Sequence, residues 1–387
     1  MKFDFETVVD RSTTGSMKWK GAMRKLQRPL TIPPLSTADM EFVCCPSIEK
    51  SIIEALTNKG VMGYTLQPDG YNEAVLKWLK EEHGYQAKEE WILQTFGIVQ
   101  ALYTAIESFS EVGDGVLIQP PVYHQFQKTI ENTKRVCIEN NLIYKDGRYF
   151  MDFEDLEKKA KQAKIMILCS PHNPVGRVWD KEDLERVQKI CNENNVIMIA
   201  DEIHFDFIAK GYHHTCYGTL EESNMILCTS PSKTFNLAGL NISNIVIPNE
   251  ELRNRFKQQL NCWGLHYQNY FGFYATMGAY SDEGKAWKNE LNEVIADNFK
   301  TIKEFFNTNY PQMHVVELEA TYLVWIDMSC LNMKGSDLEK MLMEKGEIFI
   351  EDGSKFDGNG EGFIRINIAC PKSVLLEVLN RFKKALG

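Results

Sequence analysis

Residues 196–204 read Val-Ile-Met-Ile-Ala-Asp-Glu-Ile-His, an apolar run that ends abruptly in charged and polar side chains. Six more short apolar runs surround it in the sequence, at 91–93, 116–118, 136–138, 165–169, 225–228 and 245–247. Near-continuous apolar runs are typical of strands buried on both faces, which means a largely parallel sheet between layers of helices. Amphipathic segments of helix length, such as 181–192, lie between the runs. The sequence therefore predicts an α/β fold with a mostly parallel sheet.

The pattern changes after about residue 280. A long charged segment with the character of one helix covers 284–307, and we expect it to bridge two domains. Beyond it we expect strands at 314–317, 322–326, 347–350 and 363–368, and helices at 336–345 and 372–386. The first forty-odd residues are irregular and contain prolines, so we expect them to wrap onto this part of the chain. The prediction is a large domain over 46–283 and a small α+β domain made of 1–45 together with 284–387.

The composition excludes several classes of partner. Lys and Arg number 43 and Asp and Glu number 53, so the formal net charge is −10. An acidic chain with no basic run is poorly suited to nucleic acid or to an anionic membrane surface. No stretch approaches the ~18 consecutive apolar residues of a transmembrane helix, and the first residues are polar and acidic where a secretory signal is basic and then apolar. We expect a cytoplasmic protein.

The ten cysteines include no Cys-x-x-Cys pair, and several lie inside apolar runs, among them Cys169 and Cys228. Such cysteines behave as small buried hydrophobic residues. Reduced thiols in the core of a cytosolic enzyme are therefore expected, rather than disulfides or a zinc site.

Polar side chains stand directly after four of the predicted strands. The segments are Pro-Pro-Val-Tyr at 120–123, Ser-Pro-His-Asn-Pro at 170–174, Asp-Glu-Ile-His at 201–204 and Thr-Ser-Pro-Ser-Lys at 229–233. In an open parallel sheet, ligands bind beyond the carboxyl ends of the strands. We therefore expect these four segments to converge on one edge of the sheet and form a site there.

Lys233 is the central candidate. A lysine flanked by small hydroxyl residues at a buried sheet edge suits a Schiff base, with Ser230 and Ser232 donating to a phosphate. Taken alone, the tripeptide favours an ordinary surface lysine in a loop. Asp201 ends an apolar strand, where a carboxylate is costly without a charged partner. A protonated pyridine nitrogen would be such a partner, and a structural salt bridge or helix cap is the alternative.

Four further candidates each have a structural alternative. Asn173 can donate to a ring hydroxyl or belong to an ordinary turn. Gly97, Ile98 and Val99 open a predicted helix over 100–110, and a helix N-terminus can bind an anion. Tyr123 can stack on a flat ring or simply pack. Arg365 alternates with apolar neighbours on a strand, so it can clamp a carboxylate bidentately or form a partly buried ion pair.

In this order and spacing, the segments resemble the fold-type-I pyridoxal-phosphate enzymes, the aspartate-aminotransferase superfamily. The resemblance covers essentially the whole chain and implies an aspartate-aminotransferase-like large domain with a small α+β domain. It depends on Asn-Pro-x-Gly at 173–176, the acidic residue that ends a strand, Ser-x-Ser-Lys at 230–233 and the late strand with Arg365.

Within that superfamily the chain is most similar to the cystathionine β-lyase (cysteine-S-conjugate β-lyase) subgroup. The similarity lies in the segments 38–42, 63–65, 201–206, 232–239 and 321–327. Two positions depart from the general aminotransferase pattern. Asn241 stands where those enzymes usually carry an arginine that holds the phosphate, which supports the subgroup. His204 stands where many have a tyrosine facing the ring hydroxyl, which leaves Asn173 as the safer contact.

The resemblance implies that Lys233 holds pyridoxal 5′-phosphate as a Schiff base and, once freed, takes the Cα proton as a general base. Asp201 would keep the pyridine nitrogen protonated, so that the ring acts as an electron sink. The implied catalytic residues are Lys233, Asp201 and Tyr123. The implied cofactor-binding residues are Lys233, Asp201, Asn173, Tyr123, Gly97, Ile98, Val99, Ser230, Ser232, His204 and Tyr64. The implied substrate-binding residues are Arg365, Ala38, Asn173 and Tyr322, and no metal is expected.

The reaction implied by the subgroup is α,β-elimination of L-cystathionine or related S-substituted cysteines to a thiol (homocysteine), pyruvate and ammonia. By analogy Tyr64 reaches the phosphate of the neighbouring subunit, which implies a homodimer acting on a small amino-acid substrate. An aminotransferase of the same fold shares all these residues and remains the alternative.

Two other classes of protein are less well supported. A non-catalytic regulatory or binding protein that retains the cofactor fold is a second alternative, against which the intact Lys233, Asp201 and Arg365 argue. A metal hydrolase using Asp201, His204 and Asp206 lacks the ligand pattern of a third segment.

Overall fold

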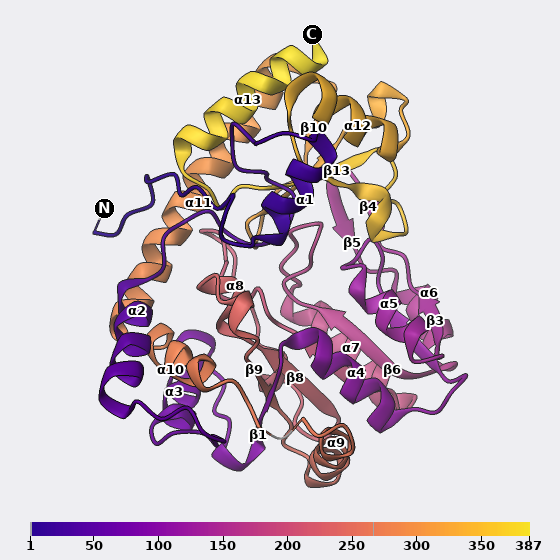
Figure 1. The fold of residues 1–387 in the computed structure, drawn as a ribbon. Helices are drawn as coiled ribbons and strands as arrows, with labels where there is room; N and C mark the ends of the chain where they lie inside the picture. The colour runs from indigo at the N-terminus through magenta and orange to yellow at the C-terminus, as the bar shows by residue number, and fades with distance from the viewer. Residues whose placement is uncertain (1, 266) are drawn as a thin grey trace.

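The computed structural model describes residues 2–265 and 267–387, and its larger part is built on a seven-stranded sheet (Figure 1). The strand order is β1-β9-β8-β7-β6-β2-β3. β9 pairs antiparallel with both of its neighbours, and the other neighbouring pairs are parallel. The strands are β1 (Ile92–Thr95), β2 (Gly115–Ile118), β3 (Val136–Glu139), β6 (Ala163–Cys169), β7 (Ile197–Asp201), β8 (Met225–Thr229) and β9 (Ser243–Val246). Every apolar run of the sequence prediction is one of these strands, so the predicted α/β fold with a mostly parallel sheet is confirmed.

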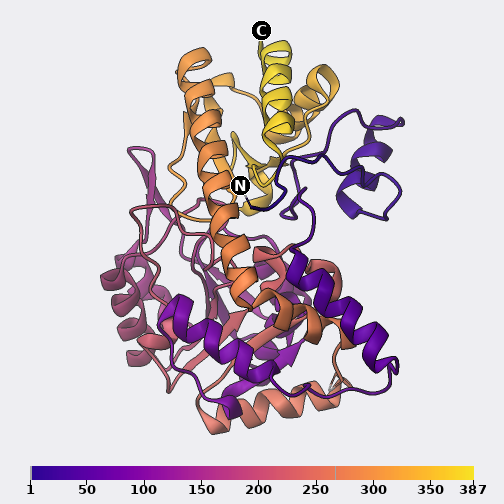
Figure 2. The same cartoon turned by 90° about the vertical axis from the view of Figure 1, so that its left-hand side faces the viewer.

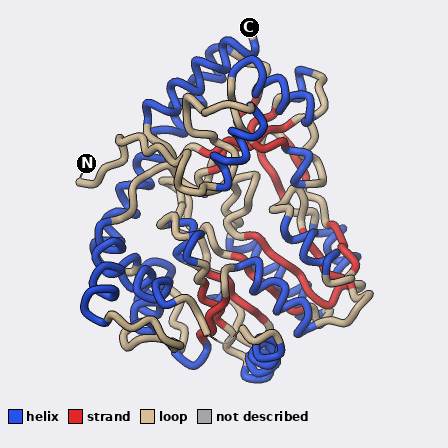
Figure 3. Tube along the Cα trace, in the orientation of Figure 1, coloured by secondary structure: helices blue, strands red, loops and turns tan. Residues whose placement is uncertain are grey.

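Helices cover both faces of this sheet (Figure 3). Ile167 and Ile199 belong to the core on the face that carries α4 and α9, and Met166 and Met198 belong to the core on the face that carries α6 and α7. Side chains of a strand alternate between faces, and here both sets are apolar. The helices are α1 (Met17–Leu26), α2 (Pro46–Glu54), α3 (Tyr71–His83), α4 (Ile98–Phe109), α5 (Gln125–Asn132), α6 (Phe153–Ala160), α7 (Lys181–Glu193), α8 (Pro231–Thr234), α9 (Glu250–Cys262), α10 (Tyr270–Ala279), α11 (Asp282–Asn309), α12 (Gly335–Gly346) and α13 (Lys372–Leu386).

A smaller antiparallel sheet has the strand order β10-β11-β13-β12. Its strands are β10 (His314–Val315), β11 (Leu323–Asp327), β12 (Glu351–Asp352) and β13 (Phe363–Asn367). The N-terminal segment lies against this sheet, because Leu35 N–H donates to Phe349 O at 3.0 Å and Asn367 N–H donates to Leu35 O at 2.9 Å. Figure 2 shows the first part of the chain beside the C-terminal helix α13. The domain boundaries at residues 46 and 284 stay a prediction.

Three local predictions need correction or addition. The N-terminal stretch expected to be irregular contains α1, which Ser16 caps and whose Trp19 and Ala22 are buried on one face. The strand expected at 347–350 is absent; β12 lies just beyond it, and the Phe349 carbonyl pairs instead with the N-terminal segment. The hairpin of β4 (Ile143–Lys145) and β5 (Arg148–Phe150) was not predicted, although Asp146-Gly147 between them, both at positive φ, is a typical hairpin turn.

Short helical turns complete the fold. They are η1 (Ala55–Lys59), η2 (Glu89–Trp91), η3 (Tyr217–Thr219), η4 (Ala238–Leu240), η5 (Ser329–Leu331) and η6 (Gly353–Phe356). None of the helices within residues 2–265 and 267–387 combines the length and the apolar character needed to cross a lipid bilayer.

Candidate active site

A cavity of about 210 Å³ opens at the carboxyl ends of β6 and β7, beside the first turn of α4. A second cavity of about 510 Å³ shares Ala38, Tyr123 and Lys233 with it and adds Arg365. The two therefore form one continuous candidate site. The residues predicted from the sequence that line the smaller cavity are Ala38, Gly97, Ile98, Val99, Tyr123, Asn173, Asp201, His204, Ser232 and Lys233.

Lys233 lies in α8, a short helix that begins with a proline and follows the carboxyl end of β8. Its Nζ donates a hydrogen bond to the carbonyl oxygen of Ala38 at 2.8 Å. Burial and the nearby positive charge of Arg365 lower the pKa of Lys233 to about 8, although the carboxylates of Asp39 and Asp201 act in the opposite direction. An amine with such a pKa is partly neutral near physiological pH, which is the form that attacks a carbonyl carbon.

Asp201 ends β7 with a side chain that is only 4% exposed. Its Oδ1 accepts a hydrogen bond from the backbone N–H of Ile203 at 3.1 Å. Burial raises the pKa of Asp201 to about 7, and the Ile203 N–H and the charge of Lys233 offset this effect only in part. A carboxyl group in this state is well suited to pair with a cationic N–H inside the cavity.

Arg365 is a buried cation whose hydrogen-bond partners are neutral. It lies on β13 and is 5% exposed. Nη1 donates to Asn173 Oδ1 at 3.0 Å and Nη2 donates to Ser36 O at 3.2 Å, while the buried Nε has no hydrogen-bond partner among the described residues. Burial lowers its pKa, and its guanidinium carbon lies 4.8 Å from the centroid of the Phe356 ring. Such a cation fits an anionic ligand such as a carboxylate.

The first turn of α4 forms one end of the smaller cavity and is suited to an anion. Gly97, at φ 92°, precedes the helix, and the backbone N–H groups of a first helical turn have no partner within the helix. Ser232 also lines this cavity. Ser230 does not: its hydroxyl donates to Ile242 O at 2.7 Å and accepts from Ser232 N–H at 3.1 Å, so that it caps α8.

Three other predicted residues lie in different places. Tyr64 is 92% exposed, its ring centroid lies 5.1 Å from that of Tyr267, and it lines neither of these two cavities of its own chain. Tyr322 is buried behind the cavity and donates its hydroxyl to Ala38 O at 3.0 Å. His204 is buried in the wall, its Nδ1 has no hydrogen-bond partner among the described residues, and burial lowers its pKa well below the ordinary value, which favours the neutral imidazole.

The structure gives Asp206 a role outside the cavity. Its carboxylate accepts hydrogen bonds from Trp78 Nε1 at 3.1 Å, from His83 Nε2 at 2.9 Å and from Thr234 Oγ1 at 2.6 Å. Among the described residues, no three His, Cys, Asp or Glu side chains are grouped to hold a metal ion. The arrangement therefore offers no support for a metal hydrolase that uses Asp206.

Several lining residues were not assigned to the site from the sequence. They are Phe96, Cys169, Ile203, Ala238, Asn241 and Ile242. Cys169 ends β6, pairs in register with Asp201 of β7, and its sulfur accepts the backbone N–H of Asn173 at 3.4 Å. Its position at the end of a strand next to Asp201 was a signal that could have placed it in the site.

Together these features define an enzyme site for a flat, phosphate-bearing cofactor with an aldehyde and a basic ring nitrogen. Lys233 is suited to the aldehyde, Asp201 to the nitrogen, and the first turn of α4 to the phosphate. The buried Nδ1 of His204, which has no partner within the described chain, is a further polar group that such a ligand can satisfy. The residues present therefore fit pyridoxal 5′-phosphate.

The chain belongs to the aminotransferase class I and II family, which it matches over residues 32–382. It is 36% identical over 391 residues to cystathionine beta-lyase PatB of Bacillus subtilis (strain 168), covering 99% of this chain and 100% of that protein. Cystalysin from Treponema denticola, whose crystal structure contains pyridoxal 5′-phosphate, superposes with a TM-score of 0.97 at 39% identity, covering 100% of this chain and 99% of that one. The pyridoxal-phosphate-bound C-S lyase from Staphylococcus hominis gives a TM-score of 0.92 at 32% identity, covering 100% and 98%. These matches confirm the family and the cofactor expected from the sequence.

Proposed function

We propose that this protein is a carbon–sulfur lyase that cleaves L-cystathionine or a related S-substituted L-cysteine by α,β-elimination. With L-cystathionine and one water molecule the products are homocysteine, pyruvate and ammonia. The proposal rests on one observation above the others, the 36% identity over almost the whole chain to a cystathionine beta-lyase, and on a cavity that fits the same cofactor. The C-S lyase of Staphylococcus hominis, similar over the whole chain, supports the same reaction class.

Each site residue has a role in this reaction. When bound, pyridoxal phosphate supplies an electron sink for the charge left on Cα after its proton is removed. Arg365 binds the substrate α-carboxylate through N–H groups that now contact only neutral oxygens, Asn173 Oδ1 and Ser36 O. Lys233 Nζ takes the Cα proton, and its lowered pKa makes the neutral amine available for this step. Asp201 holds the proton on the pyridine nitrogen, and the thiolate then leaves Cβ.

Transamination needs the same groups, so the products decide between the two reactions. The decisive experiment supplies L-cystathionine to the cofactor-loaded protein without any keto acid and follows pyruvate release. We expect sustained multiple turnovers, with Lys233→Ala protein as the inactive control. Turnover that begins only after a keto acid is added with an amino donor would make the protein an aminotransferase and overturn the proposal.

We further propose that the active form is a homodimer in the cytoplasm, with Tyr64 reaching the cofactor phosphate of the partner subunit. Tyr64 belongs to an exposed apolar stretch with Val61, Met62 and Leu66, and such stretches are typical of interfaces. All ten cysteines are free thiols, which is consistent with a reducing compartment. Sedimentation or light scattering of the loaded protein tests the dimer, and a stable active monomer would contradict it.

A further inference from the structure

Residues 37–41, here called the strap, belong to the N-terminal segment and contact Lys233. The Ala38 carbonyl of the strap accepts hydrogen bonds from Lys233 Nζ at 2.8 Å and from Tyr322 Oη at 3.0 Å. A neutral amine that donates one hydrogen to a fixed carbonyl has its lone pair directed away from that carbonyl. The position of the strap therefore sets the direction in which the Lys233 amine can attack or accept a proton.

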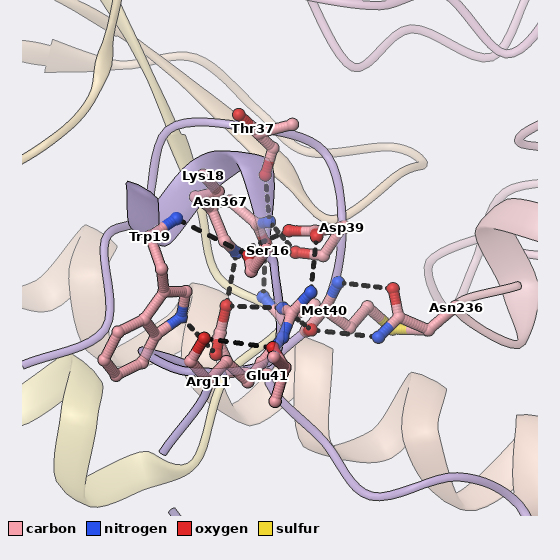
Figure 4. Close-up of polar contacts among 12 residues, drawn as sticks. Arg11, Ser16, Lys18, Trp19, Thr37, Asp39, Met40, Glu41, Asn236 and Asn367 are labelled. Carbon is pink, nitrogen blue, oxygen red and sulfur yellow. Dashed lines mark hydrogen bonds and ion pairs between the residues drawn. The ribbon is translucent and has the colours of Figure 1, made fainter. Parts of the chain in front are cut away.

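Two cations of the N-terminal side, Arg11 and Lys18, hold the strap through its own carboxylates, Asp39 and Glu41 (Figure 4). Arg11 pairs with Asp39 and with Glu41 at 2.9 Å each, and Lys18 pairs with Asp39 at 2.7 Å and Glu41 at 2.6 Å. The side chains of Lys18 and Glu41 are 0% and 1% exposed. Both cations also bond the strap backbone, Arg11 at Met40 O at 3.0 Å and Lys18 at Asp39 O at 2.9 Å.

Two asparagines tie the strap to the two halves of the candidate site. Asn236, three residues after Lys233, binds both the N–H and the carbonyl of Met40, at 2.9 and 3.0 Å. Asn367, two residues after Arg365, donates to Thr37 O at 2.8 Å and to Asp39 O at 2.7 Å. The strap is thus fixed between the loop of Lys233 and the strand of Arg365.

We propose that the partly buried cluster of Arg11, Lys18, Asp39 and Glu41 is a positioning device that fixes the Ala38 carbonyl and thereby orients the Lys233 amine relative to Arg365. The cluster has two positive and two negative charges, so it adds no net charge beside the site. Stability alone does not require it, because apolar side chains of similar volume often replace buried ion pairs without loss. Apolar side chains cannot form directional hydrogen bonds with the strap backbone, whereas Arg11 and Lys18 do. The inference rests on the proposed function only for the role of the Lys233 amine in the reaction.

The test measures cofactor capture by the full-length apoprotein, without any amino-acid substrate. Lys233 Nζ condenses with the aldehyde of pyridoxal phosphate and releases one water molecule, and the rise of visible absorbance gives the rate. Measurement well above the pKa of Lys233 keeps the amine neutral in every variant. Asn236→Gly removes both bonds to Met40, and glycine tolerates the φ of 57° at this position. Arg11→Met loosens the strap from its other side, at a residue whose hydrogen bonds among the described residues go to Asp39, Met40 and Glu41 and not to Lys233.

We expect each variant to capture the cofactor about tenfold more slowly, because misorientation of a reacting group by a small distance has effects of this order or larger. Arg11→Lys, which keeps a positive charge beside Asp39 and Glu41, should recover most of the rate. Asn332→Gly is the matched control, since Asn332 also has a positive φ of 50° and lies exposed directly after η5; it should capture the cofactor at the native rate. Circular dichroism confirms that each variant is folded.

Capture at the native rate by folded Asn236→Gly protein would overturn the proposal, and so would a native rate in folded Arg11→Met protein. If Arg11→Met does not fold, the result for Asn236→Gly decides. Because no substrate is present, failure of the lyase proposal would leave this measurement unaffected, and the two proposals can fail separately.

Discussion

Asp201→Asn should make the cofactor-free protein more stable while it nearly abolishes catalysis. The carboxyl group is buried, and its pKa is raised to about 7 from the ordinary 3.8. At about 1.4 kcal/mol per pH unit, this difference corresponds to at most about 4 kcal/mol of stability lost when the carboxyl ionises in the folded protein. Asparagine has nearly the same shape and no such charge, so it avoids this loss.

The sign of the effect depends on pH. Below about pH 4 the carboxyl is protonated in both the folded and the unfolded chain, so the native protein and the variant should have similar stability. As the pH rises from about 4 to about 7, the unfolded chain ionises first and the native apoprotein loses stability relative to the variant. Above pH 7 the difference should stay constant. Denaturant unfolding of both apoproteins at several pH values, followed by circular dichroism, measures it.

Asp206→Asn is the matched control, because it changes the same residue type in an equally buried position. Burial raises the pKa of Asp206, but the hydrogen bonds from His83 and Thr234 and the positive charge of Lys288 outweigh it, so that the pKa is lowered. This variant should therefore be less stable than the native apoprotein at neutral pH. If Asp201→Asn also proved less stable at pH 8, or if both variants behaved alike, the assignment of Asp201 as a carboxyl held ready for a cationic partner would be refuted.

With the cofactor bound, the native protein should be favoured over the Asp201→Asn variant, the reverse of the order expected for the apoproteins. The loaded native protein gains the ion pair between the carboxylate and the pyridine nitrogen, which the variant lacks. Removing one partner of a buried ion pair costs about 3–5 kcal/mol, so the elimination rate of the variant should fall by about two to four orders of magnitude. Pyruvate release at saturating cofactor measures this loss, and an unchanged rate would exclude the proposed role.

Three further outcomes test the site. Lys233→Ala protein should fold but lose both pyruvate release and the visible absorbance of the bound cofactor; full activity would show that another group does this work. Arg365→Met should raise KM by about 10- to 100-fold, since a hydrogen bond to a charged group contributes about 1.5–3 kcal/mol, and a fall in kcat alone would argue against carboxylate binding. Lys233→Ala and Tyr64→Phe chains, refolded together, should regain activity at about a quarter of the sites, because random pairing makes half of the dimers mixed with one native site each; no recovery would speak against a shared site.

The large sheet was predictable because its strands are buried on both faces. Burial on both sides makes runs such as 165–169 and 225–228 apolar at every position, and no amphipathic helix has that pattern. The candidate site was predictable for a related reason. Asp201 directly follows the run at 196–200, and Lys233 lies a few residues after the run at 225–228, so locating the strands also located the side chains that gather at their carboxyl ends.

The strand expected over 347–350 failed because of a partner distant in the sequence: the Phe349 carbonyl pairs with Leu35 instead. The missed α1 and β4–β5 hairpin differ, since they carry local signals, the Ser16 cap and Asp146-Gly147. The Ser230 hydroxyl caps α8 and donates to the Ile242 carbonyl, and its role toward a phosphate stays a prediction. Periodicity reports which face of an element is buried, but not which remote group a polar side chain will meet.

The two halves of the candidate site are also connected by contacts between residues that are distant in the sequence. Arg11 precedes α1 and Lys18 lies in its first turn, both in a polar N-terminal stretch, and nothing in the local sequence marks their partners Asp39 and Glu41. Yet the loop of Lys233 and the strand of Arg365 are both hydrogen-bonded to the strap. Asn236 binds the backbone of Met40, and Asn367 binds the carbonyl oxygens of Thr37 and Asp39. Any movement of β13 relative to α8 must stretch or break one of those bonds. In the proposed roles, the distance between the amine that takes the Cα proton and the guanidinium that binds the carboxylate is therefore set through the hydrogen bonds of Asn236 and Asn367 to the strap.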